Sequence, residues 1–380
     1  MVLGTLGAVV LAAVVVMVII LMLRKDDSTS ATNTGGEQST SAADTSSTTP
    51  KPDAATPESA GTDPGQQRPA STPQSAQPTE SFSPDANATA KQAIALYNQK
   101  QYVQSQPLFE KACNGGDADS CDYLGWMYQH NLGVDTDLTR AIALYDKGCQ
   151  VGSMAACNNE ADMYENHKGV AQDYQRALAL YTHACDRDFA ISCDSLGYMY
   201  EFKEGVTQDL PRAVSLYDKA CTGGNMSGCK NEGWMYQYHL GVGQDYAKAV
   251  SLYTKACDGG NLLGCNNLGF MYQHKMGVEQ DYPKALALYT KACDGDEASA
   301  CNSLGVMYEE HQGVSEDDAR AVTLYTKACD GGNANGCSDL GNMYREGKGI
   351  GKDAGKARVL LTKGCNMGSQ WGCDNLKEMH

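Results

Sequence analysis

The chain has 380 residues, enough for two domains of average size, and 46 acidic against 30 basic side chains give a formal net charge of −16 at pH 7. Residues 88–380 hold 37 of the acidic and 26 of the basic residues, a net charge of −11. Because phosphate backbones are bound by basic surfaces, this balance argues against nucleic acid as a partner. It suits a peptide or protein that exposes Lys or Arg side chains.

Residues 1–23 form an apolar run in which Thr5 is the one polar residue. The run is long enough to cross a bilayer as a helix. Arg24 and Lys25 follow it, where a cleaved signal peptide would have small residues. We therefore predict an uncleaved transmembrane anchor, with a cleaved signal peptide as the alternative.

Residues 24–87 are rich in Ser, Thr, Ala, Pro, Gly and Gln and nearly lack large apolar side chains. Such a segment buries too little apolar surface to offset the entropy of ordering it. We predict a disordered tether, with a root-mean-square reach of roughly 45 Å from the random-coil relation.

All 16 cysteines lie after this segment, in pairs whose members are 8 residues apart, and each pair follows the last by 36 residues. A fixed period in the thirties is typical of a helical repeat array. The pairs are Cys113 with Cys121, Cys149 with Cys157, Cys185 with Cys193, Cys221 with Cys229, Cys257 with Cys265, Cys293 with Cys301, Cys329 with Cys337 and Cys365 with Cys373.

Two cysteines at this spacing fit a disulfide, a zinc site or a reduced core. Zinc sites favour Cys-x-x-Cys spacing, often with histidine, yet the chain has no such motif and no histidine on the 36-residue period. A reduced core would explain one position but not two. Disulfides are therefore favoured, and they place the repeats outside the cytoplasm, in a periplasm or beyond the cell. Arg24 and Lys25 oppose this topology, since Lys and Arg flank spans on the cytoplasmic side.

The repeat around Cys265 shows the expected architecture. Cys265, Leu268 and Tyr272 fall on one helical face, and Gly277-Val278 is expected to end that helix. Asp281 supplies an N-cap for a second helix, with Pro283 in its first turn. The sequence thus predicts an all-α solenoid of helix-turn-helix repeats, in which each hairpin buries its apolar face against its neighbours.

The recurring phrases, such as Asn267-Leu-Gly-Phe-Met-Tyr and Leu288-Tyr-Thr-Lys-Ala-Cys, resemble the Sel-one-like repeat, and the periodic cysteines are similar to those of its cysteine-rich, Hcp-like branch. The resemblance covers a half-repeat at 88–116, seven repeats at 117–368 and a closing helix at 369–380. It implies a superhelix related to tetratricopeptide arrays and a role as an adaptor for proteins or peptides. It also implies, as an alternative, binding of β-lactams or peptidoglycan with slow β-lactamase-type hydrolysis.

Residues for such hydrolysis are not evident. One Ser-x-x-Lys occurs, at Ser227-Gly-Cys-Lys230, without the Ser-Asp-Asn and Lys-Thr-Gly motifs of serine β-lactamases. Because Ser227 lies at a repeat turn, we expect it to be structural. We predict no catalytic residue, no metal site and no cofactor, and an adaptor rather than an enzyme.

A binding surface is better supported. Counted from the first-helix cysteine as zero, positions 3, 4, 6 and 7 are nearly constant, whereas positions 5 and 9 vary and lie opposite the cysteine. In the tetratricopeptide arrays that the chain resembles, the matching positions line a concave groove. The alternative is that the aromatic residues there pack between helices and are mostly buried. The predicted binding residues, with three glutamates at position 8, are Trp126, His130, Glu165, Tyr198, Glu201, Phe202, Trp234, Tyr238, Phe270, His274 and Glu309.

Two further positions depart from the repeat. Glu160 and Glu232 replace the position-3 leucine, so we expect them at an edge that reaches solvent, the alternative being a polar contact that shapes the groove. His167, His239 and His311 recur every 72 residues, where the first helix runs into its loop, and are expected to be surface residues.

Overall fold

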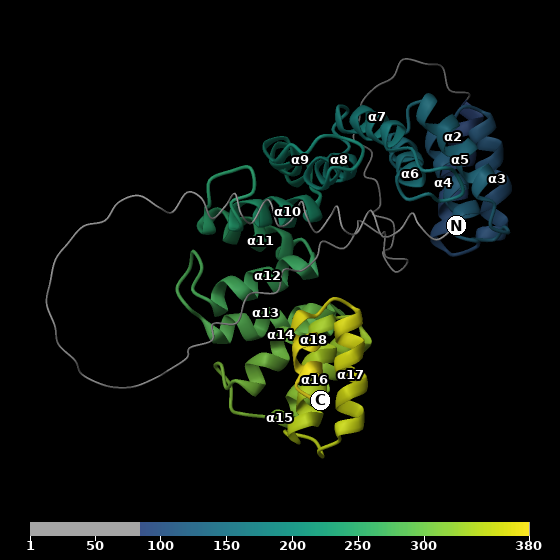
Figure 1. Ribbon diagram of the computed structural model, residues 1–380. Helices are drawn as coiled ribbons and strands as arrows, with labels where there is room; N and C mark the ends of the chain where they lie inside the picture. The colour runs from purple at the N-terminus through teal and green to yellow at the C-terminus, as the bar shows by residue number, and fades with distance from the viewer. Residues whose placement is uncertain (1–83, 380) are drawn as a thin grey trace, which may run out of the picture. The chain divides into compact units, whose positions relative to one another are not determined.

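The structure is a computed structural model that describes residues 84–379 (Figure 1). The predicted anchor at 1–23 and the tether as far as residue 83 lie outside the described residues. Seventeen helices and no strand occur in the part described, which confirms the predicted all-α class. None of these helices is long and apolar enough to cross a membrane.

The helices form hairpins in which a first helix is followed by a second. Consecutive hairpins stack in chain order, as the colours of Figure 1 show from α2 to α18. The first helices are α2 Pro84–Asn98, α4 Ala118–Gln129, α6 Met154–Glu165, α8 Ala190–Phe202, α10 Met226–Gln237, α12 Leu262–Gln273, α14 Ala298–Glu309 and α16 Ala334–Glu346. The second helices are α3 Tyr102–Asn114, α5 Leu138–Gln150, α7 Tyr174–Cys185, α9 Leu210–Thr222, α11 Tyr246–Asp258, α13 Tyr282–Asp294, α15 Asp318–Asp330 and α17 Ala354–Asn366. The last helix is α18 Gln370–Lys377.

The array begins earlier than the sequence indicated. Helix α2 starts at Pro84, before the expected boundary at 88, and α2 with α3 makes a complete hairpin rather than a half-repeat. Helix α2 lacks the cysteine and the Met-Tyr pair that the first helices from α4 to α16 share. It packs instead through small side chains, since Ala86, Ala90 and Ala93 are buried.

Helix ends follow local chemistry. In each second helix from α5 to α17 an aspartate is the N-cap and accepts a hydrogen bond from the backbone N–H three residues later, a contact worth about 1 kcal/mol. Asp281 is one of these, as predicted. The prediction for the end of the helix before it was wrong. Helix α12 ends at Gln273, since Lys275 takes a left-handed backbone conformation with φ of 57°.

The core between the two helices of a hairpin explains the constant positions. A tyrosine of each second helix from α5 to α15 is fully buried, with Tyr253 at 0 % exposure. Except on α6, where position 4 is Ala161, its ring lies against the position-4 glycine of the first helix. A Cβ atom on Gly233 would lie 2.8 Å from the ring of Tyr253. The glycine therefore sets how closely the two helices pack.

All eight predicted disulfides are present, and each joins the second helix of one hairpin to the first helix of the next, with Cα–Cα distances from 4.4 to 4.7 Å. Each bridge closes a short loop, for which the loop-entropy relation gives about 2.5 kcal/mol. The bridges thus hold every junction between hairpins from α3 to α18. The bonds are Cys113 with Cys121, Cys149 with Cys157, Cys185 with Cys193, Cys221 with Cys229, Cys257 with Cys265, Cys293 with Cys301, Cys329 with Cys337 and Cys365 with Cys373.

The first-helix cysteines belong to the scaffold and not to a surface that a partner could reach. Seven of them have no exposed surface, and the eighth, Cys373 on α18, is half-buried. Their burial places the bridges inside the junctions, so the cysteines support a binding surface without forming part of it. The seven are Cys121, Cys157, Cys193, Cys229, Cys265, Cys301 and Cys337.

Candidate binding groove

The first helices form one layer of the array. From α8 to α16 each first helix contacts the first helix of the next hairpin, as α4 contacts α6 and α16 contacts α18. The second helices make no comparable contacts with one another within residues 84–379. Because the first helices approach one another more closely, their layer forms the inner side of the array.

Positions 4 and 8 contact the second helix of their own hairpin, and at 100° per residue positions 5 and 9 lie to one side of them, which assigns positions 5 and 9 to this inner side. In four repeats they hold two rings, one turn apart, that contact each other in a tilted arrangement, and we call each such pair a rung. The ring centroids are 3.9 to 4.4 Å apart, close enough for direct contact. The rungs are Trp126 with His130 on α4, Tyr198 with Phe202 on α8, Trp234 with Tyr238 on α10 and Phe270 with His274 on α12.

The rungs are partly exposed. Trp126, Tyr198, Trp234 and Phe270 are all half-buried, and Phe202 is 37 % exposed. Most of the surface of Trp126, Tyr198, Trp234 and Phe270 is covered, so their burial alone does not decide between a groove and packing between helices. Each ring contacts its neighbour in the rung and keeps a minor part of its surface open.

The three predicted binding glutamates have a first role inside the hairpin. The position-8 side chain accepts a hydrogen bond from the buried tyrosine of the second helix, as Tyr181 Oη donates to Glu165 at 2.7 Å. Glu201 accepts from Tyr217 at 2.6 Å and Glu309 from Tyr325 at 2.6 Å. Gln129, Gln237 and Gln273 make the same bond in other repeats. These glutamates therefore support the groove first and can attract a partner only through their charge.

Position 8 also reaches the loop of the next hairpin. Gln273 Nε2 donates to Gln312 at 2.6 Å, and Lys348 Nζ lies 3.1 Å from Glu309. The equivalent neighbour of Glu165 is Glu204, so two carboxyl groups meet where other repeats pair an amide or a lysine. Burial, followed by a hydrogen bond with Glu204 and its charge, raises the pKa of Glu165 to about 7.

The two rung histidines are held neutral. Burial lowers the pKa of His274, and burial together with the nearby Lys168 lowers the pKa of His130. His130 Nε2 is buried and has no hydrogen-bond partner among the described residues. Both imidazoles therefore act as flat, uncharged rings near neutral pH.

The prediction that Glu160 and Glu232 reach solvent was wrong. Both are 1 % exposed, and each is paired with a basic side chain of the second helix in its own hairpin. Arg176 lies 2.8 Å from Glu160, and Lys248 lies 3.1 Å from Glu232. Burial raises the pKa of both carboxyls, and the basic partners oppose the rise. The pairs lie between the two helices of a hairpin, not on the groove.

His167, His239 and His311 are exposed, as predicted. Each takes a left-handed backbone conformation, with φ of 54°, 58° and 61°, just after the first helix. Their shared place is therefore explained by the end of that helix.

A cysteine–histidine cluster and the Ser-x-x-Lys motif are both parts of the scaffold. The sulfurs of Cys149 and Cys157 lie with a ring nitrogen of His183 within 4.8 Å of one another, but the sulfurs are bonded to each other. Ser227 Oγ accepts a hydrogen bond from Asn261 at 3.4 Å, which links two neighbouring hairpins.

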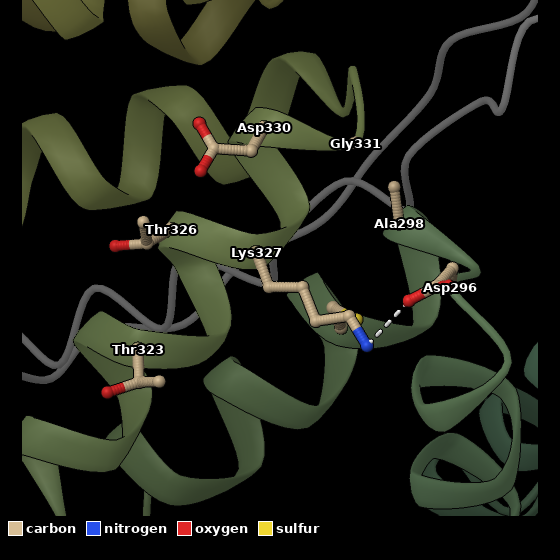
Figure 2. A pocket seen from close by; sticks show the side chains of 8 residues that line it. Asp296, Ala298, Thr323, Thr326, Lys327, Asp330 and Gly331 are labelled. Atoms are coloured by element: carbon tan, nitrogen blue, oxygen red, sulfur yellow. Dashed lines mark ion pairs between the residues drawn. The ribbon is translucent and has the colours of Figure 1, made fainter.

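A hollow of about 460 Å³ lies away from the rungs, against the second half of α15 and the turn before α14. Figure 2 shows Lys327 reaching across it to Asp296, with Thr323 and Thr326 along its side. The ion pair is 2.9 Å long, and Lys327 also donates to the carbonyl of Cys293. Lys219 makes the same two contacts in another hairpin, to Asp188 and to the carbonyl of Cys185, so we assign this lysine to the packing of the repeats.

The family model of the Sel1 repeat matches residues 118–153, 155–189, 190–225, 231–261, 262–297, 298–333 and 334–369. The chain belongs to the Sel1 repeat family. The hairpins from α4 with α5 to α16 with α17 are therefore Sel1 repeats, and α2 with α3 is a further hairpin of the same build. Proteins of this family mediate protein–protein interactions.

Two solved structures share the fold, and a third is similar in sequence over a shorter part of the chain. One is c5321, a protective antigen of uropathogenic Escherichia coli, at 27% identity and a TM-score of 0.61 over 77% of this chain. The chain spans 64% of that antigen's length. A Sel1 repeat protein of Oxalobacter formigenes has 23% identity and a TM-score of 0.58, over 63% of this chain and 96% of its own. Helicobacter pylori cysteine rich protein B is 30% identical over 35% of this chain and 96% of its own, with a TM-score of 0.30. None of the curated proteins matches the chain.

The sequence reasoning missed the loop residues that complete the inner side. Glu204, Lys168 and Lys348 occupy one loop position, each 39 residues after a position-8 side chain. The 36-residue period of the sequence could have identified these loop residues. Counting the loop positions in the same way as the helix positions would have shown two carboxyl groups meeting at Glu165 and Glu204.

Proposed function

We propose that this Sel1 repeat protein is an adaptor that binds a peptide or protein segment along the inner face of its first helices. The observation that carries the proposal is the set of partly exposed aromatic rungs, in which two tilted rings contact each other. Aromatic side chains give large contact area for little loss of side-chain entropy, and they are enriched in recognition surfaces. The scaffold behind them is held by the buried tyrosines of α5 to α15 and by a disulfide at every junction between hairpins.

The charge of the surface favours a partner with Lys or Arg side chains. The repeat region is acidic, and Glu165 and Glu204 lie beside the rung of Tyr198. Burial raises the pKa of the Tyr198 hydroxyl, and these two carboxylates raise it further. Opposite charge speeds encounter and selects partners more than it adds affinity. Basic residues of a partner would therefore lie beside the rungs rather than on them.

We also propose that residues 1–23 anchor the array at a membrane and that the repeats act outside the cytoplasm. The eight disulfides support this, since such bonds persist in oxidising compartments. The test is thiol labelling of protein taken from its own cells under denaturing conditions. Sixteen blocked cysteines that become reactive after reduction agree with export, and sixteen reactive cysteines without reduction contradict it.

The binding proposal is tested by selecting peptides from a random displayed library against the full chain. Affinities of the selected peptides are then measured for two variants, the double change Trp234→Ala with Tyr238→Ala and the single change Trp371→Ala. Trp371 is 54 % exposed on α18, outside the rungs, and serves as the control. We expect the rung variant to weaken binding about tenfold or more and the control to leave it unchanged. Peptides that bind the rung variant as tightly as the original chain would refute the groove.

The alternative of β-lactam binding and hydrolysis has no observation in its favour. The contact of Ser227 is that of a link between repeats.

A further inference from the structure

Three of the four rungs are consecutive. They belong to α8, α10 and α12, and these helices contact one another in that order. The fourth rung, on α4, is separated from them by α6. The inner face therefore presents three similar aromatic platforms in an unbroken row, formed by Tyr198 with Phe202, Trp234 with Tyr238 and Phe270 with His274.

The row ends at both sides for a chemical reason. On α6 the rung positions hold Asp162 and Asn166, and Asp162 is paired with Lys168 at 2.8 Å and bonded by the Asn166 amide at 2.8 Å. On α14 the positions hold Val306 and the exposed Glu310. Polar or small groups thus replace the rings, and the apolar row spans three repeats.

Helices in packing contact lie about 8–10 Å apart, and we take this as the spacing of the rungs because α8, α10 and α12 contact one another in order. An extended chain advances about 3.3 Å per residue, so three residues cover about 10 Å. Side chains at the first, fourth and seventh positions of an extended segment would therefore meet the three rungs in turn. A helix rises about 1.5 Å per residue and would need about fifteen residues for the same reach, at a larger cost of ordering.

The ends of the row carry negative charge and its middle does not. Glu165 and Glu204 lie at the α8 end, and Glu309 and Glu310 lie at the α14 end, where Lys348 pairs with Glu309. Within the row, position 8 is the neutral Gln237 on α10 and the neutral Gln273 on α12, and it is Glu201 on α8, the helix at the end that also has Glu165 and Glu204. A complementary ligand is apolar in its middle and basic beyond both ends.

We propose that the three consecutive rungs bind an extended segment with apolar side chains at every third position and with Lys or Arg beyond both ends of the apolar stretch. The inference rests on the proposed function and adds the register and the charge of the partner.

The test uses labelled synthetic peptides and fluorescence anisotropy with the full chain. The peptides share one composition, with three leucines among serines and two lysines at each end, and the leucines are spaced by two, three, four or seven residues. We expect the three-residue spacing to bind about tenfold tighter than the others. The double change Trp234→Ala with Tyr238→Ala, but not Trp371→Ala, should remove this preference. Added salt should lower the affinity of the lysine-ended peptides. Replacing the terminal lysines by glutamates is expected to weaken binding, and added salt should then no longer lower the affinity.

The outcomes separate the two proposals. Equal binding of all spacings, or preference for the seven-residue helical spacing, overturns the register, and the groove itself stands if the rung variant still weakens binding. Glutamate-ended peptides that bind as well as lysine-ended ones overturn the charge assignment. Both proposals are refuted if no synthetic peptide binds the original chain and if the peptides selected from the library bind the rung variant as tightly as the original chain.

Discussion

The junction between Glu165 and Glu204 gives a sharp prediction on stability. A carboxyl group whose pKa is higher in the folded protein than in the unfolded chain costs stability once it is ionised. For Glu165 the values are about 7 and 4.5. The contribution of the Glu165 carboxyl group to the free energy of unfolding is therefore fully present below about pH 4.5 and is lost as the pH rises through 7. At about 1.4 kcal/mol for each unit of pKa, the whole loss is about 3.5 kcal/mol. Partial exposure of Glu165 and its coupling to a neighbouring group reduce it to about 1–2 kcal/mol.

The perturbation is Glu165→Gln, which places at this position the residue that three other repeats already hold. The amide oxygen still accepts from Tyr181, as Gln237 accepts from Tyr253 at 2.7 Å, and the amide N–H groups can donate to Glu204. We expect a gain of about 1–2 kcal/mol in the free energy of unfolding at about pH 8 and almost none at about pH 4.5. Urea denaturation followed by circular dichroism at the two pH values measures both.

The matched control is Glu309→Gln. Glu309 makes the same bond to a buried tyrosine but lies 3.1 Å from Lys348 instead of a carboxyl group. This change removes an attraction, so it is expected to leave stability at the higher pH unchanged or to lower it. Equal gains at the two pH values for Glu165→Gln, or a gain of the same size for Glu309→Gln, would refute the reasoning.

Three further predictions concern the scaffold. Arg176→Ala should cost about 2 kcal/mol, because it leaves the buried carboxylate of Glu160 unpaired, and Glu160→Leu in the same background should restore most of it in urea denaturation. The double change Cys257→Ala with Cys265→Ala should lower the free energy of unfolding by about 2.5 kcal/mol, and an unchanged urea midpoint would argue against the loop-entropy account. Gly233→Ala should cost about 1–3 kcal/mol, because its Cβ would meet the ring of Tyr253 at 2.8 Å, and thermal melting against the exposed-site control Gly243→Ala checks this.

The sequence predicted the scaffold well because one constraint repeats. Paired cysteines, capping aspartates and a Met-Tyr pair recur every 36 residues, so each repeat supports the interpretation of the others. For the same reason, the sequence predicted only half of the first hairpin, α2 with α3. Helix α2 buries Ala86, Ala90 and Ala93 and has none of the recurring residues that mark the other first helices.

The site was harder to predict because its side chains serve two purposes. The spacing of Glu165, Glu201 and Glu309 showed that they lie near the inner face, but not that each accepts a bond from a buried tyrosine sixteen residues later. Glu160 and Glu232 were placed at the surface because a carboxylate on a core face is costly. The structure offsets that cost with a basic side chain of the second helix, and this pairing depends on the distance between two helices rather than on a local pattern.

The central claim is that the partner lies along the aromatic rungs of α8, α10 and α12. Its most direct test is covalent footprinting of the full chain, with and without the tightest peptide selected from the library, read by mass spectrometry of individual residues. The account predicts that the peptide protects Tyr198, Trp234 and Phe270, while Trp371 and the hollow at Thr323 keep their reactivity. Protection at the hollow or along the second helices, with the three rings unchanged, would contradict it.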